Sequence, residues 1–184
     1  MPVRGRNVAA AALAAVLVGL LLAAVDARAD TPSTGGFPSE PPPPPEPLAR
    51  AAVSSDRRTA LAPVGAPAAV VKAVAAANRI TRKPYKWGGG HGRWRDTGYD
   101  CSGSVSYVLH AAGLLRVARA SGDLMSYGWG GEGKWITIYA NGGHAYMVIA
   151  GLRFDTSGRG EKGPRWRLEP RSERGYVKRH PSRL

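Results

Sequence analysis

The sequence predicts an α+β domain in which helices come first and an antiparallel sheet follows. Apolar residues recur at helical spacing within residues 68–80 and 101–112, whereas short β-branched and aromatic runs separated by turn residues occupy residues 135–179. The chain of 184 residues has room for one domain of ordinary size. We place this domain at residues 68–184.

Two segments before the domain are not expected to contribute to its core. Residues 1–29 combine Arg4 and Arg6, an apolar run and the sequence Ala27-Arg28-Ala29, which is the pattern of a secretory signal peptide cleaved after Ala29. Because the apolar run is long, an uncleaved membrane anchor is the alternative. Residues 30–67 are rich in Pro, Ser and Ala, with five consecutive prolines, and predict a disordered linker.

The helical half of the domain contains two predicted helices. The first covers Ala68–Ile80, and Pro84 prevents its continuation. Residues 88–98 are Gly-rich and predict a flexible loop. The second helix runs from Cys101 to about Ala112, where a glycine follows as a C-terminal stop. Residues 114–133 contain too many glycines for a regular element, so an irregular segment is expected there.

The sheet half begins with a β-branched and aromatic run after residue 134. A turn at Asn141-Gly142-Gly143 then separates two strands. Short runs of the same kind, the last two weaker, predict strands at residues 135–139, 144–149, 152–156, 164–168 and 175–179.

Cys101 is the only cysteine in the sequence and lies at the predicted start of the second helix. Asp100 and Ser102 suit such a position as capping residues. A thiol in the first turn is close to the positive end of the helix dipole, which favours the nucleophilic thiolate. In an exported chain a single thiol has no disulfide partner, so a reactive thiol is one reason for its presence. A small buried core cysteine is the alternative.

His144 is the best candidate for a base that acts on this thiol. It begins an apolar strand after a Gly-rich turn, so its side chain can face inward at the edge of the sheet. His91 lies in the Gly-rich loop and His180 in a basic tail, and an offset of nine residues puts His110 on the far side of the helix from Cys101. A cysteine hydrolase needs a thiolate, an imidazole and a third group that orients the imidazole.

Asp155 is expected to be the orienting group. If a two-residue hairpin loop follows Ile149, that residue pairs with Leu152, and Asp155 lies diagonal to His144 on the same face of the sheet. Ser157 then lies directly opposite His144. A register shift of one residue would turn Asp155 away, so a turn or surface carboxylate is the alternative.

Two further patterns do not carry a function. Residues 128–134 fit a phosphate-binding loop by letter, but Trp135 replaces the Ser or Thr that would hold magnesium, and a strand follows instead of a helix. Cys101 and the histidines lack the paired spacing of a zinc site. We therefore expect no metal and no cofactor.

Three short motifs together resemble the NlpC/P60 cysteine peptidases, which are papain-like enzymes that cut peptidoglycan stem peptides. They are Tyr-x-x-Gly-Gly from Tyr85, Asp-Cys-Ser-Gly from Asp100 at a helix start, and Gly-His at a strand start. The resemblance covers residues 68–158 and implies a papain-like fold with helices packed on a small antiparallel sheet. It implies Cys101 as nucleophile and His144 as base.

The same resemblance implies further roles. Tyr85 would contribute to the oxyanion region, and Asp100 with Ser102 would bind substrate, Asp100 through a substrate amine. The third catalytic position, often His in the family, falls here at Asp155. The segment between Tyr85 and Cys101 is longer than is usual in the family. The implied substrate bond is the D-γ-glutamyl-diaminopimelate link or its lysine counterpart.

The formal charge is +13, of which +11 remains on residues 30–184. This charge suits an anionic partner outside the cell, such as peptidoglycan in a bacterial wall. Export and the lack of a clustered aromatic and basic surface argue against nucleic acid. We expect a secreted, cell-wall-associated, monomeric endopeptidase that touches a membrane only through an uncleaved signal segment. An acyltransferase or amidase acting on lipid or another wall amide, and a non-catalytic wall-binding module, are the alternatives.

Overall fold

The computed structural model of the protein describes residues 50–158 and 162–184. The predicted signal peptide and residues 30–49 of the predicted linker lie outside them. Helices and an antiparallel sheet make up the described part, so the predicted α+β class is confirmed. No helix in these two ranges is both long and apolar enough to cross a bilayer.

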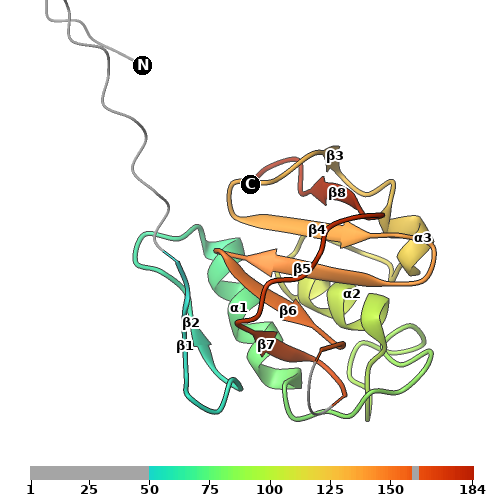
Figure 1. The fold of residues 1–184 in the computed structure, drawn as a ribbon, viewed down its shortest axis with the longest axis horizontal. Helices are drawn as coiled ribbons and strands as arrows, with labels where there is room; N and C mark the ends of the chain where they lie inside the picture. The colour runs from blue at the N-terminus through green and yellow to red at the C-terminus, as the bar shows by residue number, and fades with distance from the viewer. Residues whose placement is uncertain (1–49, 159–161) are drawn as a thin grey trace, which may run out of the picture. The chain divides into compact units, whose positions relative to one another are not determined.

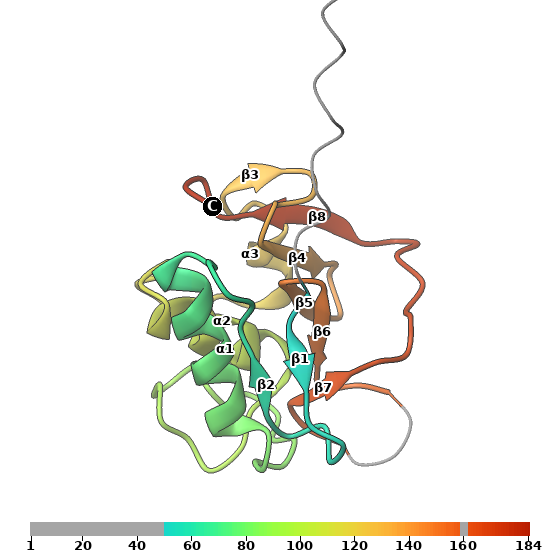
Figure 2. The same cartoon turned by 90° about the vertical axis from the view of Figure 1, so that its left-hand side faces the viewer.

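The two predicted helices are present with nearly the predicted bounds. Helix α1 spans Ala68–Ile80, and α2 spans Cys101–Ala111. The buried face of α1 is made mostly of alanine and valine, and such small side chains allow close packing against a neighbouring helix. The two helices contact each other and both contact strand β5, and Figure 2 shows them on the same side of the sheet.

The sheet is antiparallel at every pairing and has the strand order β3-β8-β4-β5-β6-β7 (Figure 1). All five predicted strands are found as β4 to β8, with ends up to two residues from the predicted ones, and β3 is an additional strand. The strands are β3 (Trp129–Gly130), β4 (Ile136–Ala140), β5 (Ala145–Ile149), β6 (Leu152–Asp155), β7 (Arg165–Arg167) and β8 (Val177–His180).

Side chains along β5 and β6 point alternately into the core and to the opposite face of the sheet. Met147 and Phe154 face each other in the ladder and belong to the buried apolar core. Because successive strand residues point to opposite faces, Tyr146, Arg153 and Asp155 belong to the other face. This second face therefore carries aromatic and charged side chains close to the strand ends where the site lies.

The hairpin between β5 and β6 has the register expected from the sequence. Ile149 pairs with Leu152, and the two loop residues both have positive φ, +46° at Ala150 and +75° at Gly151. A two-residue hairpin turn needs both of its residues in the left-handed backbone conformation if its twist is to match that of the strands. This register places residue 155 diagonal to residue 144, as predicted.

The predicted linker ends earlier than expected, because residues 50–67 contain a small hairpin. Strands β1 (Ala52–Val53) and β2 (Ala60–Leu61) pair with each other. The side-chain amide of Asn78 in α1 accepts from the N–H of Ala60 and donates to its C=O, both at 2.9 Å. Composition could not reveal this hairpin, since the groups that hold it come from a helix that follows it in the chain.

Residues 88–98 form a loop, as predicted, and several of its side chains contact the rest of the domain or the loop itself. The Trp94 ring stacks on His110 of α2, with centroids 3.9 Å apart. The Asp96 carboxylate accepts from the N–H of Gly90 at 3.2 Å and from Lys86 Nζ at 2.8 Å. Glycine content signals backbone freedom, but these polar and aromatic contacts restrict it.

Residues 114–133 are less irregular than predicted. They contain the short helix α3 (Ser121–Leu124) and strand β3, which pairs with β8. A side chain at Gly128 would place its Cβ 2.0 Å from the carbonyl oxygen of His180, so this glycine permits close approach of two backbone segments. Some glycines in this segment are therefore needed for close packing. The number of glycines in the sequence does not distinguish this role from that of glycine in loops.

Candidate active site

Cys101 is the first residue of α2, a free thiol with only 7% of the residue's surface exposed. Asp100 is the N-cap residue, and its Oδ1 accepts from the N–H of Gly103 at 2.6 Å. The N–H of Cys101, by contrast, has no acceptor within the helix, and no backbone acceptor for it is found elsewhere among the described residues. The helix start thus presents a thiol and a hydrogen-bond donor together.

His144 is positioned by the turn that leads into β5. Oδ1 of Asn141 accepts from the N–H groups of Gly143 at 2.9 Å and of His144 at 2.8 Å. The imidazole is close enough to the Cys101 thiol for the two to shift each other's pKa, and its Nε2 lies 2.9 Å from Oδ1 of Asp155. The structure therefore brings together the three side chains that were predicted as catalytic.

Asp155 is the last residue of β6 and is 1% exposed. Its Oδ1 also accepts from the backbone N–H of Ser157 at 2.9 Å and from the Ser157 hydroxyl at 3.1 Å. The hydroxyl oxygen lies 3.3 Å from His144 Nε2, so both candidate orienting residues reach the imidazole. The shorter distance belongs to Asp155.

The thiol of Cys101 and the imidazole of His144 shift each other's pKa in the directions that favour an ion pair. Burial acts to raise the pKa of the Cys101 thiol, but the hydrogen bond with His144 and one from the N–H of Ala145 outweigh it, and the pKa lies below its ordinary value. Burial acts to lower the pKa of His144, yet its hydrogen bonds with Asp155 and Cys101 raise it to about 9. Both shifts are in the direction that favours a thiolate and imidazolium pair.

Arg171 is part of this arrangement, although no sequence pattern predicted it. Its Nη1 donates to Oδ2 of Asp155 at 3.1 Å and also to the Ser157 hydroxyl, and its Nη2 donates to the Tyr176 hydroxyl at 2.7 Å. Burial acts to raise the pKa of Asp155, but the bonds from His144 and Ser157 and the charge of Arg171 hold it below its usual value. Arg171 lies in a basic C-terminal segment with no motif.

Tyr85 lies close to the nucleophile. Burial raises the pKa of its phenol, and the nearby charges of Cys101 and Asp100 raise it further. Tyr85 and His144 line a cavity of about 390 Å³ together with Thr156, Ser157, Gly158 and Lys162. The hydroxyl of Thr156 is buried and has no hydrogen-bond partner in the described part of the chain. Thr156 and Lys162 were not predicted, because neither belongs to a recognisable motif.

Asp100 and Ser102, predicted to bind substrate, are engaged by other groups of the protein. Oδ2 of Asp100 accepts from the N–H of Gly88 at 3.0 Å, and the Ser102 hydroxyl donates to Oδ1 at 3.2 Å. His91 Nε2 lies 3.1 Å from both Asp100 Oδ1 and Ser102 Oγ. The His91 ring therefore covers the two predicted contact groups, and their role in substrate binding stays a prediction.

The remaining histidines lie outside the site. Nδ1 of His110 contacts the carbonyl of Leu115 at 3.0 Å, and Nδ1 of His180 contacts that of Pro181 at 3.1 Å. Across residues 50–158 and 162–184, no three His, Cys, Asp or Glu side chains form a group suited to a metal ion.

Comparison with known proteins yields fold similarity only. No protein-family model matches the sequence, and no curated protein matches it. Among solved structures, it is similar to an NlpC/P60 family protein from Bacillus cereus ATCC 10987, with 21% identity, a TM-score of 0.48, and coverage of 67% of this chain and 42% of that one. It is also similar to a hypothetical invasion protein of Mycobacterium tuberculosis, with 22% identity, a TM-score of 0.45, and coverage of 60% and 61%.

The first of these structures is an NlpC/P60 family protein. The family that the sequence motifs suggested is therefore found among the similar structures. The chain spans less than two thirds of the length of either structure, 42% of one and 61% of the other. At this level of similarity the matches do not define an activity, a substrate or a partner.

Proposed function

We propose that the protein is a secreted cysteine endopeptidase with a papain-like NlpC/P60 fold, and that it hydrolyses amide bonds in the stem peptides of peptidoglycan. The observation that supports this most is the grouping of the Cys101 thiol at a helix N-terminus with His144, which is hydrogen-bonded to Asp155 and lines a cavity. A thiolate, an imidazolium and an orienting carboxylate are the groups that amide cleavage by a thiol requires.

In the first half of the reaction the Cys101 thiolate attacks the scissile carbonyl carbon, and a C–S bond forms. The N–H of Cys101 and the phenol of Tyr85 are the donors available to the developing oxyanion. The imidazolium of His144 gives its proton to the leaving nitrogen as the C–N bond breaks. A thioester remains on Cys101, and the amine product leaves.

In the second half a water molecule attacks the thioester while neutral His144 takes its proton. The C–S bond breaks, a carboxylate product is released and the thiolate is restored. Because Nε2 of His144 is occupied by Asp155 at 2.9 Å, Nδ1 is the nitrogen that serves the thiol, the leaving amine and the water. Asp155 keeps the ring in this orientation and stabilises its charged form.

The substrate follows from the family resemblance and from charge. The resemblance implies the D-γ-glutamyl-diaminopimelate bond, and the net charge of +11 on residues 30–184 favours an acidic polymer. Lys162 adds a positive charge at the cavity that holds His144, where a carboxylate of the stem peptide would be attracted. Asp100 and Ser102 would contact a substrate amine once the His91 ring moves aside.

Mass spectrometry of purified peptidoglycan after incubation with the protein tests the proposal. We expect stem-peptide fragments with new amino groups on diaminopimelate, and no fragments with the Cys101→Ala variant. Phospholipid vesicles incubated in parallel should yield no deacylated product. Fatty acid release without stem-peptide cleavage would instead indicate an acyltransferase, and wall binding without any product would indicate a binding module.

A further inference from the structure

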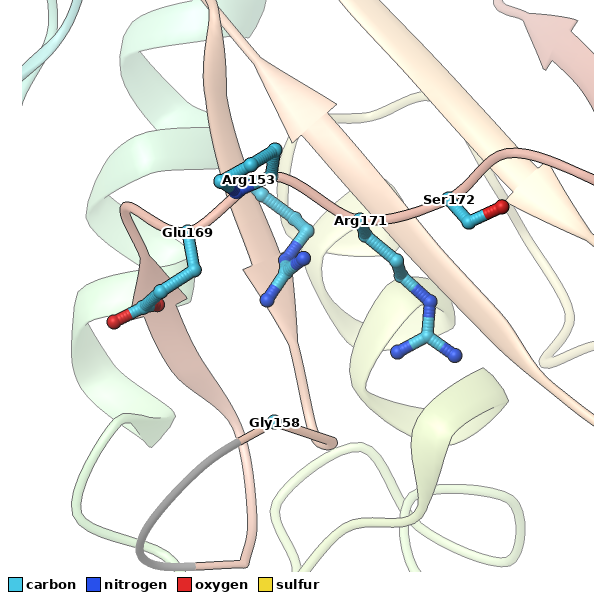
Figure 3. A pocket seen from close by; sticks show the side chains of 6 residues that line it. Arg153, Gly158, Glu169, Arg171 and Ser172 are labelled. Atoms are coloured by element: carbon cyan, nitrogen blue, oxygen red, sulfur yellow. The ribbon is translucent and has the colours of Figure 1, made fainter.

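A second cavity lies on the face of the sheet that carries Tyr146 and Arg153. Its volume is about 580 Å³. Gly158 lines this cavity and also the catalytic one, so the two are adjacent. The lining residues are Arg153, Gly158, Glu169, Pro170, Arg171 and Ser172 (Figure 3).

Arg153 is the unusual residue of this cavity. Only 10% of its side chain is exposed, and its Nε atom is buried with no hydrogen-bond partner in the described part of the chain. The nearest carboxylate oxygen is Oδ2 of Asp155, at 3.7 Å, and that oxygen already accepts from Arg171 at 3.1 Å. A buried guanidinium donor without an acceptor is costly, so the site as it stands favours an additional anion.

The charges around the cavity also favour an anion, because arginine side chains predominate there. Arg153, Arg167 and Arg171 all lie near the carboxylate of Asp155. Burial lowers the pKa of Arg167, and although the charge of Asp155 opposes this, the neighbouring charge of Arg153 lowers it further. The arginines therefore repel one another at this site.

The acidic residue in the cavity wall, Glu169, lies near Arg153 and Arg167 and offsets this excess in part. The Glu169 carboxylate forms an ion pair with Arg57, outside the cavity wall. In Figure 3 the Arg153 and Arg171 side chains both extend toward the loop that holds Gly158, whereas the Glu169 carboxylate points away from them. The cavity therefore presents two guanidinium groups toward one space.

We propose that this cavity is an oxyanion-binding site in which Arg153 and Arg171 bind a phosphate or carboxylate group. Guanidinium groups bind both anions through paired N–H donors, and the donors of Arg171 not used by Asp155, Ser157 and Tyr176 are available for this beside the positive charge of Arg153. The site shares Arg171 with the proposed peptidase site but does not require the thiol. A phosphodiester polymer and the free carboxylates of peptides are the two sources that would present such a group.

Titration of the purified chain with inorganic phosphate and, separately, with succinate tests the site. Ionic strength is held constant with sodium chloride, and the Arg Nε–Hε resonances are followed by NMR. We expect a saturable shift of the Arg153 resonance with at least one of the two probes. Arg153→Gln should weaken binding by about tenfold or more, whereas Lys72→Gln, which removes the same charge from the exposed surface of α1, should leave it unchanged.

Each result has a definite meaning. Saturation by phosphate alone identifies a phosphate site, saturation by succinate alone a carboxylate site, and saturation by both a general oxyanion site. Shifts that rise linearly without saturation, or equal affinity in the Arg153→Gln and unsubstituted chains, would overturn the proposal. If Arg153→Gln does not fold, the response of the Arg153 resonance in the unsubstituted chain decides. Binding by a Cys101→Ala chain separates this result from the fate of the peptidase proposal.

Discussion

Arg171 donates to Oδ2 of Asp155 at 3.1 Å, which leaves Oδ1 of the same carboxylate for His144 at 2.9 Å. The carboxylate is thus held from both oxygens, and its depressed pKa keeps it ionised at neutral pH. Arg171 also packs over the Tyr146 and Tyr176 rings, at 5.2 and 5.4 Å from their centroids. It is a positioning residue that acts through Asp155.

Replacement of Arg171 by Met should lower kcat/KM by roughly 10- to 100-fold, the usual effect of losing a group that orients a reactive side chain. Loss of the positive charge also raises the pKa of Asp155, so the acid limb of the pH profile should move to higher pH. Arg171→Lys keeps the charge and should move the limb less. A lower Tm with an unchanged pH profile would show that Arg171 is only structural.

The thiol of Cys101 should react rapidly with iodoacetamide at neutral pH, because its pKa is lowered by His144 and Ala145 despite burial. In His144→Ala the burial remains but the hydrogen bond and the charge are lost, so the pKa should rise and alkylation at pH 7 should slow. Alkylation rate against pH measures both. Equal profiles in the two proteins would contradict the ion pair.

Catalysis should depend on pH differently from alkylation. The folded-state pKa of His144 is raised to about 9, so the imidazolium is present below that pH and is lost as pH rises through it. Peptide release should therefore fall above about pH 9, whereas alkylation, which needs only the thiolate, should not fall. The stability that this proton contributes should be lost as pH rises from about 6.5 to about 9, which thermal unfolding at several pH values can measure.

Asp155→Ala should reduce turnover less than His144→Ala, since an orienting group contributes less than the acid and base itself. Ser157→Ala should have a small effect, because its hydroxyl lies 3.3 Å from Nε2 whereas the Asp155 oxygen lies at 2.9 Å. Steady-state kinetics on a defined stem peptide gives the ranking. A larger loss in Ser157→Ala than in Asp155→Ala would reverse the two assigned roles.

Gly103 is expected to be intolerant of substitution. A Cβ at this position would lie 1.9 Å from the carbonyl oxygen of Gly89, where the segment before α2 crosses the helix start. Gly103→Ala should therefore lower the free energy of unfolding by about 2–3 kcal/mol, as overpacking does. Gly92→Ala is the matched control, since no atom lies within 4 Å of its added Cβ. Denaturant unfolding that gave equal stability for both variants would refute this packing argument.

Much of the chain organisation was predictable from local pattern. The bounds of α1, the start of α2 at Cys101 and the five longer strands follow from periodicity and turn residues, which act within a few residues. The register of the β5–β6 hairpin was also predictable, because a two-residue loop fixes the pairing of Ile149 with Leu152. That pairing in turn fixes the position of Asp155 relative to His144.

What the sequence alone determined is therefore the cysteine at a helix start, the histidine at a strand start and the hairpin that aligns the Asp155 carboxylate with it. The tertiary structure decided the contacts between segments far apart in the chain. Arg171 reaches Asp155 across 16 residues, and Asn78 holds the β1–β2 hairpin from a helix 18 residues beyond Ala60. Such contacts depend on where packing places each side chain. A sequence pattern with a period of two or 3.6 residues shows which face of a strand or helix a residue occupies, but not which distant residue it meets.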